Sequence, residues 1–322
     1  MTRLLRLVAT RALAAIPTLV LVALGAFVLV ELAPGDAVDA YLAETGGDAG
    51  FAAETRRRLG LAATPFERLG GFLLGLASLD LGKSLVFNRP VFAVVAERLP
   101  NTLLLMATSL AFASGIGLAL GLAAGAKPGS ARDRGLSGLG FLLLAMPNFW
   151  LALVLILVFV VTLPWFPIGG IATIGQPPSI LDTARHLVLP TVALGAGYVA
   201  LYLRTLRAGM LDAWPMDHVR AARARGLPER AVVLGAVARP ALLPTIVVLG
   251  QNAGTLVGGS IVIETVFAIP GTGRLAFEAV TGRDTAMLAA VVLTSTLLVI
   301  AINLAVDLLL ARLDPRIGAR HG

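Results

Sequence analysis

Long runs of hydrophobic residues separated by short polar segments form the main pattern of this chain. A helix needs roughly 20 apolar residues to cross the hydrocarbon core of a bilayer. We therefore expect an all-α integral membrane protein with six transmembrane helices. Pro147 lies inside the third apolar stretch and is expected to kink it, because proline removes a backbone hydrogen bond. The six stretches are Ala12–Leu32, Leu103–Ala126, Gly138–Leu163, Leu187–Leu206, Leu242–Ile263 and Ala286–Leu310.

The composition agrees with a membrane protein. Of the 322 residues, 57% are hydrophobic and only 14% are charged, whereas soluble domains carry about 25% charged residues. The net charge of +7 comes from basic residues in short loops between the apolar stretches, which is an orientation signal rather than a nucleic-acid surface. The chain has no cysteine, so it has no disulfide and no thiolate metal site.

The basic residues also predict which side of the membrane each loop faces. Cytoplasmic loops carry the excess of Lys and Arg. The short loops on one side carry only Arg185, Arg274 and Arg283. The opposite side, which holds both termini, is therefore expected to be cytoplasmic. Its basic residues are Arg3, Arg6, Arg11, Lys127, Arg132, Arg134, seven arginines from Arg204 to Arg239, Arg312, Arg316 and Arg320.

This topology divides the chain into segments. We expect a tail with the first helix in residues 1–32, an extracytoplasmic loop in 33–101, a five-helix core in 102–312 and a cytoplasmic tail in 313–322. The amphipathic segment Pro90–Arg98 is expected to lie flat on the outer surface. A cleaved signal peptide is the alternative interpretation of the first stretch, which is however longer than a typical signal-peptide core.

Catalytic motifs are absent from the sequence. His186, His218 and His321 do not pair at helical spacing, and no HExxH, GxSxG or GxxxxGK[ST] sequence occurs. Two other function classes remain open at this point. An ion-coupled secondary transporter would show charged residues at the bilayer midplane or inverted repeats. A membrane-embedded enzyme would need reactive groups assembled from separate helices.

The most informative segment is a cytoplasmic loop at about 212–240. The sequence from Asp217 to Arg230 predicts two short helices with a break at Gly226, because glycine is favoured just past a helix end and Pro228 at a helix start. Small Ala221 and Ala222 would allow close approach of a partner. Arg220, Arg223 and Arg225 would pair with its carboxylates. The alternative is a basic loop that only fixes topology.

This loop resembles the EAA loop of ABC importer permeases, which is the coupling helix that docks on the ATPase. Ala221, Ala222 and Gly226 match the general pattern, whereas Arg220 replaces its Glu and Arg239 its Pro. Both departures are similar to the dipeptide/oligopeptide/nickel branch of the family, which the run from Val219 to Leu227 follows closely. The resemblance implies that ATPase coupling involves Asp217, Arg220, Ala221, Ala222, Arg223, Gly226 and Leu227.

Further segments in the same order resemble this branch over nearly the whole chain. They are Leu32–Asp36, Leu79–Ser84, Arg98–Leu103, Ala241–Pro244, Glu264–Gly273, Asn303 with Asp307, and Asp314–Arg316. The resemblance implies a type I ABC importer permease fold with a coupling helix and a large outer loop, in a bacterial inner membrane. It also implies a second homologous permease, two cytoplasmic ATPases and an extracytoplasmic solute-binding protein as partners.

The same resemblance bears on cofactors and substrates. We expect this chain to bind no cofactor, with ATP and Mg on the ATPase subunits. Closely similar permeases carry dipeptides, oligopeptides, nickel chelates or glutathione, so the resemblance implies a class of small solutes rather than one compound.

Polar residues within apolar stretches are candidates for the translocation pathway or its gate. They are Gln251, Asn252, Glu264, Asn303 and Asp307. Helix-to-helix hydrogen bonding is the alternative role for Gln251 and Asn252, and a structural pair for Asn303 and Asp307, which lie four residues apart on one helix face. In the fifth stretch, Gly254, Gly258 and Gly259 favour a tight packing seam.

Overall fold

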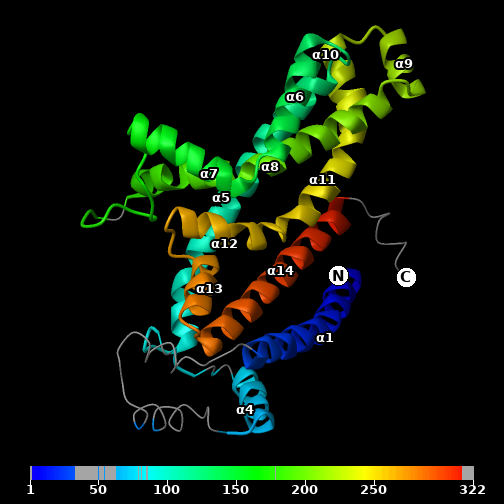
Figure 1. Cartoon of the computed structure of the whole chain (residues 1–322). Coiled ribbons are helices and arrows are strands. Elements are labelled where there is room, and N and C mark those ends of the chain that lie inside the picture. The colour runs from blue at the N-terminus through cyan, green and yellow to red at the C-terminus, as the bar shows by residue number, and fades with distance from the viewer. Residues whose placement is uncertain are drawn as a thin grey trace. The chain divides into compact units, whose positions relative to one another are not determined.

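The computed structural model describes residues 2–32, 50, 54, 63–78, 80, 82–84, 86–177 and 179–313. Within these ranges every regular element is a helix (Figure 1). The chain forms two compact units, which we describe separately. Unit 1 comprises residues 1–102 and 270–301, and unit 2 comprises 103–269 and 302–322. In the predicted outer loop at 33–101, the part up to residue 62 lies outside the described residues except for residues 50 and 54.

Unit 1 contains α1 (Thr2–Leu32), α4 (Pro65–Ala77), α13 (Thr272–Thr281) and the first parts of α5 (Val91–Gly125) and α14 (Thr285–Leu313). The core of unit 1 forms where α5, α13 and α14 meet, around Val91, Val94, Leu275, Met287 and Val291. The expectation of a separate surface helix at Pro90–Arg98 is wrong, because this segment is the first part of α5. Val91, Val94 and Val95 of this segment pack in that core.

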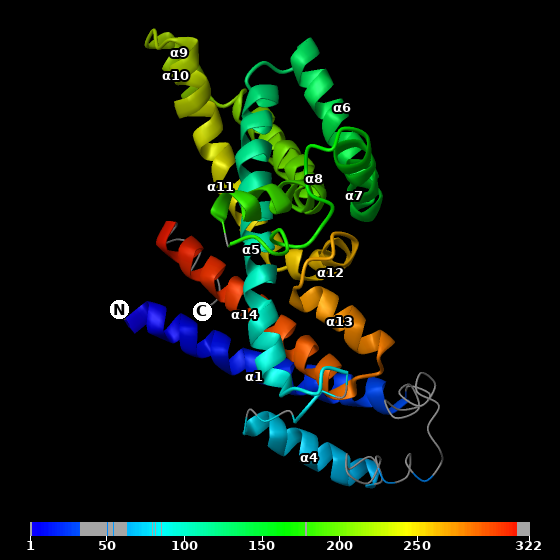
Figure 2. The same cartoon turned by 90° about the vertical axis from the view of Figure 1, so that its left-hand side faces the viewer.

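Unit 2 is built around α8 (Ile180–Ala213), whose central residues Leu194, Tyr202 and Leu203 are fully buried. The remainder of α5 packs on α8 together with α6 (Ala131–Ala145), α7 (Asn148–Ile156) and α11 (Arg239–Ala253). Figure 2 shows α9 (Asp217–Ala224) and the turn between α5 and α6 at the same end of this unit.

The predicted kink at Pro147 is confirmed. Helix α6 ends at Ala145, and α7 continues at Asn148 into a π-helical segment η1 (Leu157–Thr162), with an angle of 99° between the two parts. Met146 has an extended backbone with ψ 123°, which is the conformation that a following proline imposes. In the described part of the chain, five helices are long and apolar enough to cross a membrane. The number rises to six if the bent pair of α6 and α7 is counted as one span.

The fifth apolar stretch differs from the expected range Leu242–Ile263. Its helix begins earlier, with α10 (Glu229–Ala231), continues through a π-helical segment η2 (Val232–Ala238), and ends with α11 at Ala253. A break at Gly254 and Thr255 separates it from α12 (Leu256–Val266). The expected start was late because Arg239 looked like a loop residue, whereas the helix continues through it.

Candidate functional site: the loop helix and its supports

The predicted loop helix exists as α9, which begins at Asp217 and ends at Ala224. Asp217 lies in its first turn and Arg223 in its last turn, so both charges complement the helix dipole. The second short helix begins at Glu229, directly after Pro228. The sequence pattern therefore predicts both helices and the break between them correctly.

Gly226 ends α9 in the left-handed conformation, with φ +74°. Its N–H donates to the Arg223 carbonyl at 2.9 Å, and the Leu227 N–H donates to the Ala222 carbonyl at 3.4 Å. This pair of bonds is a Schellman motif, which satisfies carbonyls that the helix end leaves without partners. A Cβ atom at Gly226 would meet no heavy atom within 4 Å. The constraint on this residue is therefore conformational rather than steric.

The two adjacent alanines of α9 differ in their environment. Ala222 is buried with Val219 in a cluster that we call the base cluster, whereas Ala221 is exposed. The expectation that a large side chain at residue 222 would clash directly with a partner therefore needs revision, since it would first clash within this chain. The base cluster consists of Leu206, Met210, Ala213, Val219, Ala222, Val232, Val237, Ala238 and Ala241.

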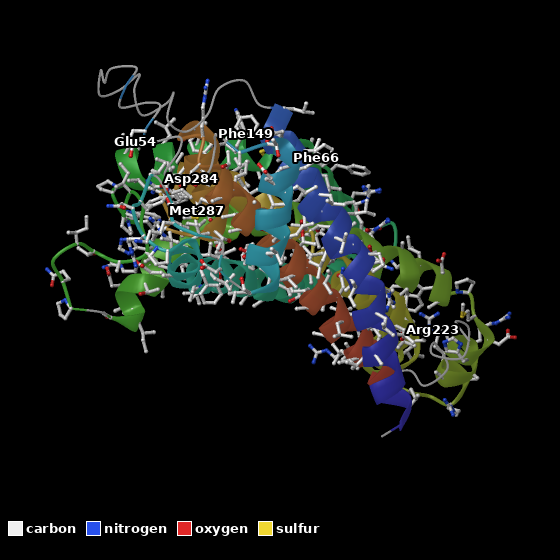
Figure 3. The ribbon with its side chains drawn as sticks, turned by 90° about the horizontal axis from the view of Figure 1, so that it is seen from below. Glu54, Phe66, Phe149, Arg223, Asp284 and Met287 are labelled. Carbon is white, nitrogen blue, oxygen red and sulfur yellow. The ribbon has the colours of Figure 1, made fainter. Side chains whose placement is uncertain are left out.

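The loop arginines pair within the chain. Arg220 forms an ion pair with Asp217. Arg223, labelled in Figure 3, donates to Glu229 at 2.6 Å across the Gly226 turn, and this hydrogen bond raises the pKa of the guanidinium. The same guanidinium lies 4.8 Å from the centre of the Trp214 ring. Arg220, Ala221 and Leu227 remain exposed and form the outer side of the loop.

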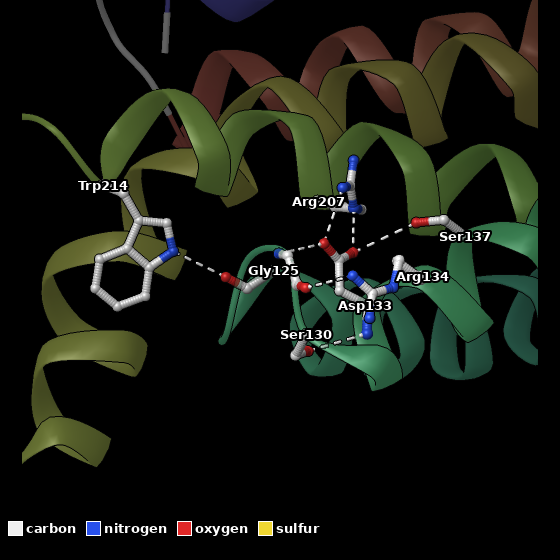
Figure 4. Close-up of polar contacts among 8 residues, drawn as sticks. Gly125, Ser130, Asp133, Arg134, Ser137, Arg207 and Trp214 are labelled. Atoms are coloured by element: carbon white, nitrogen blue, oxygen red, sulfur yellow. Dashed lines mark hydrogen bonds and ion pairs between the residues drawn. The ribbon is translucent and has the colours of Figure 1, made fainter.

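A buried ion pair supports the neighbouring loop, and the sequence analysis missed it. Arg207 on α8 donates to Asp133 at the start of α6 through Nε at 2.5 Å and Nη2 at 2.9 Å (Figure 4). Asp133 is 1% exposed and also accepts from the Gly129 N–H at 2.9 Å. Ser130 caps α6 by accepting from the Asp133 N–H. The Ser-x-x-Asp spacing before an apolar run was a signal for this helix start.

A glycine seam on α5 was also missed. Gly117, Gly121 and Gly125 lie at intervals of four residues, so they share one helix face. Cβ atoms at these positions would lie 2.9 Å from the Val199 carbonyl, 2.9 Å from the Leu203 carbonyl and 2.6 Å from Met210 Sδ, respectively. The small residues therefore let α5 approach α8 closely. In the seam expected from the fifth stretch, a Cβ atom at Gly259 would lie 3.0 Å from Leu194 Cδ1, whereas one at Gly258 would meet open space.

The pathway candidates lie on three helices of unit 2. Gln251 and Asn252 lie in the last turn of α11, and Asn252 donates to the Val248 carbonyl at 2.7 Å. Glu264 on α12 is fully buried within the chain. On α14, Asn303 is exposed and Asp307 is half-buried. Their roles in transport stay predictions.

Segments that resemble the peptide branch bind one another in unit 1. Asn101 donates to the Pro270 carbonyl at 2.8 Å, and the hydroxyls of Thr102 and Thr272 lie 3.0 Å apart. Ser84 donates to Asp284 at 2.5 Å. Residues from distant parts of the sequence therefore join the first third of α5 to the start of α13, and the segment before α5 to the residue before α14, on what the topology predicts to be the outer side.

Comparisons with known proteins identify the family. Residues 115–319 match the family described as binding-protein-dependent transport system inner membrane component. The oligopeptide transport system permease protein AppB of Bacillus subtilis is 36% identical over 308 residues, covering 95% of this chain and 97% of the relative. The di/tripeptide transport system permease protein DppB of Pseudomonas aeruginosa is 35% identical over 324 residues, covering 95% and 96%.

The fold has a solved counterpart. The MetNI methionine ABC transporter, in an inward-facing conformation, contains a chain with a TM-score of 0.56 and 20% identity, over 69% of this chain and 97% of that one. The family assignment sets aside the ion-coupled transporter and the membrane enzyme as alternatives. This chain therefore belongs to the binding-protein-dependent transport system inner membrane component family, and it is a membrane permease subunit of an ABC importer, with ATP hydrolysis on separate subunits.

Proposed function

We propose that this chain and a second homologous permease form the translocation pathway for peptides or a related small solute. A solute-binding protein delivers the solute from outside, and two cytoplasmic ATPases bind ATP and Mg and drive transport. This chain binds no cofactor itself. The peptide assignment is supported by the names of the relatives, which are oligopeptide and di/tripeptide permeases at 35–36% identity over nearly the full chain.

The proposed site of ATPase contact is the outer side of the loop around α9, with Asp217, Arg220, Ala221 and Leu227 exposed. The observation that carries this proposal is the division of α9 into two sides. Val219 and Ala222 anchor the helix to the base cluster, while the opposite side is left for a partner. Arg223 and Gly226 contribute by fixing the loop conformation, and Ala222 by seating the helix.

The proposed orientation places this loop in the cytoplasm of a bacterial cell, with both termini on the same side. The basic α5–α6 turn and α9 lie at one end of unit 2 (Figure 2), and the Trp214 indole binds the carbonyl of Gly125 at 2.9 Å. Loops that the Lys and Arg distribution assigns to one side of the membrane therefore meet in space. This agreement supports the assignment.

Ala221→Trp tests the docking surface, because it adds bulk on the exposed side without entering the base cluster. We expect normal membrane levels but loss of ATPase co-purification and of uptake of a labelled tripeptide. Ala131→Trp is the matched control, since Ala131 is exposed at the start of α6. Equal ATPase recovery from both variants would contradict docking at α9.

Gly226→Val tests the loop conformation in the same assay. A β-branched residue resists the left-handed conformation by roughly 1–2 kcal/mol, so the Schellman turn opens and ATPase recovery falls. Gly226→Asn is the control, because asparagine tolerates this region of backbone conformation. Loss of recovery with asparagine but not with valine would argue against a conformational role.

A further inference from the structure

Trp214 is the residue at which three segments of the cytoplasmic end meet. It follows the last residue of α8, and its ring lies half-buried against the base cluster. Its indole N–H donates to the Gly125 carbonyl at 2.9 Å. Gly125 is the last residue of α5, where carbonyls have no partner within their own helix. The indole therefore joins the ends of α5 and α8 by a directed bond (Figure 4).

Trp214 also contacts the loop helix α9. The Arg223 guanidinium lies 4.8 Å from the centre of the ring, which is within range for a cation–π interaction. Glu229 fixes this guanidinium with bonds of 2.6 Å from Nη2 and 3.4 Å from Nε. The orientation of α9 relative to the α8 end is thus held by a contact outside the base cluster.

The hydrophobic contacts of α9 alone define its orientation poorly. Only Val219 and Ala222 of its eight residues are buried, and both have short side chains. They keep α9 against the base cluster but do not by themselves fix its rotation about its own axis. At the N-terminal end of α9, His218 Nε2 lies 2.8 Å from the Ala236 carbonyl of η2. At the C-terminal end, the Trp214–Arg223 contact restrains the helix. At the α5 end, Gly125 packs on Met210 of α8 so closely that no side chain fits between them.

We propose that Trp214 is a positioning residue that holds α9 in a fixed orientation on the ends of α5 and α8, so that these helices move with α9 as one body. The proposal rests on the proposed docking at α9, since the ATPase supplies the movement. Trp214 does not contact the ATPase in this scheme. It converts a displacement of the loop helix into a displacement of two membrane-spanning helices.

The test uses the complete transporter, with the cysteines of the partner subunits replaced. This chain contains no cysteine, so spin labels can be attached at Lys127→Cys beside the α5 end and at Ala224→Cys on α9, both of which are exposed. The distance distribution between the two labels is measured without nucleotide and after trapping with ATP and vanadate. We expect one narrow distribution in both states, because the two segments move together.

Trp214→Leu is expected to broaden this distribution while ATPase co-purification is retained. Arg223→Met is expected to broaden it as well, but ATPase recovery is not its readout, because this change also removes the ion pair with Glu229 that fixes the loop. The double variant is expected to broaden it by less than the sum of the two single changes, because the two residues share the ring–guanidinium contact. Trp214→Phe keeps the ring face but loses the N–H donor, so its broadening is smaller. Trp214→Phe also replaces Trp214→Leu as the test variant if Trp214→Leu fails to accumulate. Trp150→Leu, which removes a half-exposed indole of α7, is the control.

The outcomes separate this inference from the proposed function. An unchanged distribution in Trp214→Leu overturns the positioning role, even if the Ala221→Trp result supports docking. Loss of ATPase co-purification in Trp214→Leu with a narrow distribution also overturns it, because Trp214 would then act in docking. Retained ATPase recovery in Ala221→Trp would contradict docking at α9. The distances between the two spin labels would still test whether Trp214 links α9 to the ends of α5 and α8.

Discussion

Arg207 binds Asp133 through two parallel hydrogen bonds of 2.5 and 2.9 Å, and this pair ties the start of α6 to the C-terminal part of α8. Asp133 is almost fully buried, whereas the Arg207 side chain retains 29% of its exposure. The carboxylate depends on this partner, because a buried charge without one is costly. The α5–α6 turn, which contains Gly129 and Ser130, is organised around the same carboxylate.

We predict that Arg207→Met lowers the stability of the chain by on the order of 2 kcal/mol, less than for a fully buried pair because Arg207 is partly exposed. The midpoint of thermal unfolding in detergent measures this loss. Arg132→Met is the control, since Arg132 is exposed one residue before Asp133. Adding Asp133→Leu to Arg207→Met should recover part of the loss. Equal midpoints for Arg207→Met and Arg132→Met would refute the prediction.

The glycine seam gives a prediction with a control on the same helix. In Gly121→Ala the new Cβ would lie 2.9 Å from the Leu203 carbonyl, whereas at Gly115 there is open space. We expect Gly121→Ala to destabilise the chain by about 1–3 kcal/mol through overpacking. Gly115→Ala should be neutral or stabilising by up to about 1 kcal/mol, because alanine favours helix. The same thermal assay applies, and a reversed order of the two variants would rule out the seam.

Asp284 joins the start of α14 to the segment before α5 in unit 1. Its carboxylate accepts from the Met287 N–H at 3.0 Å, which caps α14, and from the Ser84 hydroxyl (Figure 3 labels Asp284 and Met287). Asp284→Ala removes the cap and leaves Ser84 without this acceptor, at a cost of about 1–3 kcal/mol. Ser84→Ala keeps the cap and should cost less in the same unfolding measurement. A loss from Ser84→Ala as large as that from Asp284→Ala would show that the cap is unimportant.

The features predicted correctly from sequence have local causes. Gly226 requires a left-handed turn, Asp217 and Pro228 mark helix starts, and Pro147 breaks a helix, so a few neighbouring residues decide each outcome. The direction of Ala222 was also readable, because Val219 and Ala222 lie three residues apart on one face of α9.

Other features depend on contacts between distant residues. Arg207 and Asp133 are 74 residues apart in sequence, and neither apolar stretch shows that they meet. The helix that begins at Glu229 passes through Arg239. Because arginine is strongly polar, hydropathy alone placed the start of this helix after it. Hydropathy likewise gave no sign of the break at Thr255, whose hydroxyl bonds to the Asn252 carbonyl at 2.8 Å.

Membrane orientation is tested with single cysteines. We expect Glu54→Cys to react with an impermeant maleimide in intact spheroplasts, and Lys127→Cys to react only after lysis, since the Lys and Arg distribution places these residues on opposite sides. Both positions are exposed in the structure. Labelling of Lys127→Cys but not Glu54→Cys in intact spheroplasts would invert the proposed topology.

The most direct test of the account is photocrosslinking from α9 to the ATPase. A benzophenone attached at Ala221→Cys, on the exposed side of the loop helix, should crosslink to the ATPase subunit in the assembled transporter. The same probe at Ala131→Cys, on the neighbouring loop, should not. Efficient ATPase crosslinking from residue 221 and none from residue 131 is the predicted result. No crosslink from residue 221, or equal crosslinking from both positions, would contradict the assignment of α9 as the coupling surface.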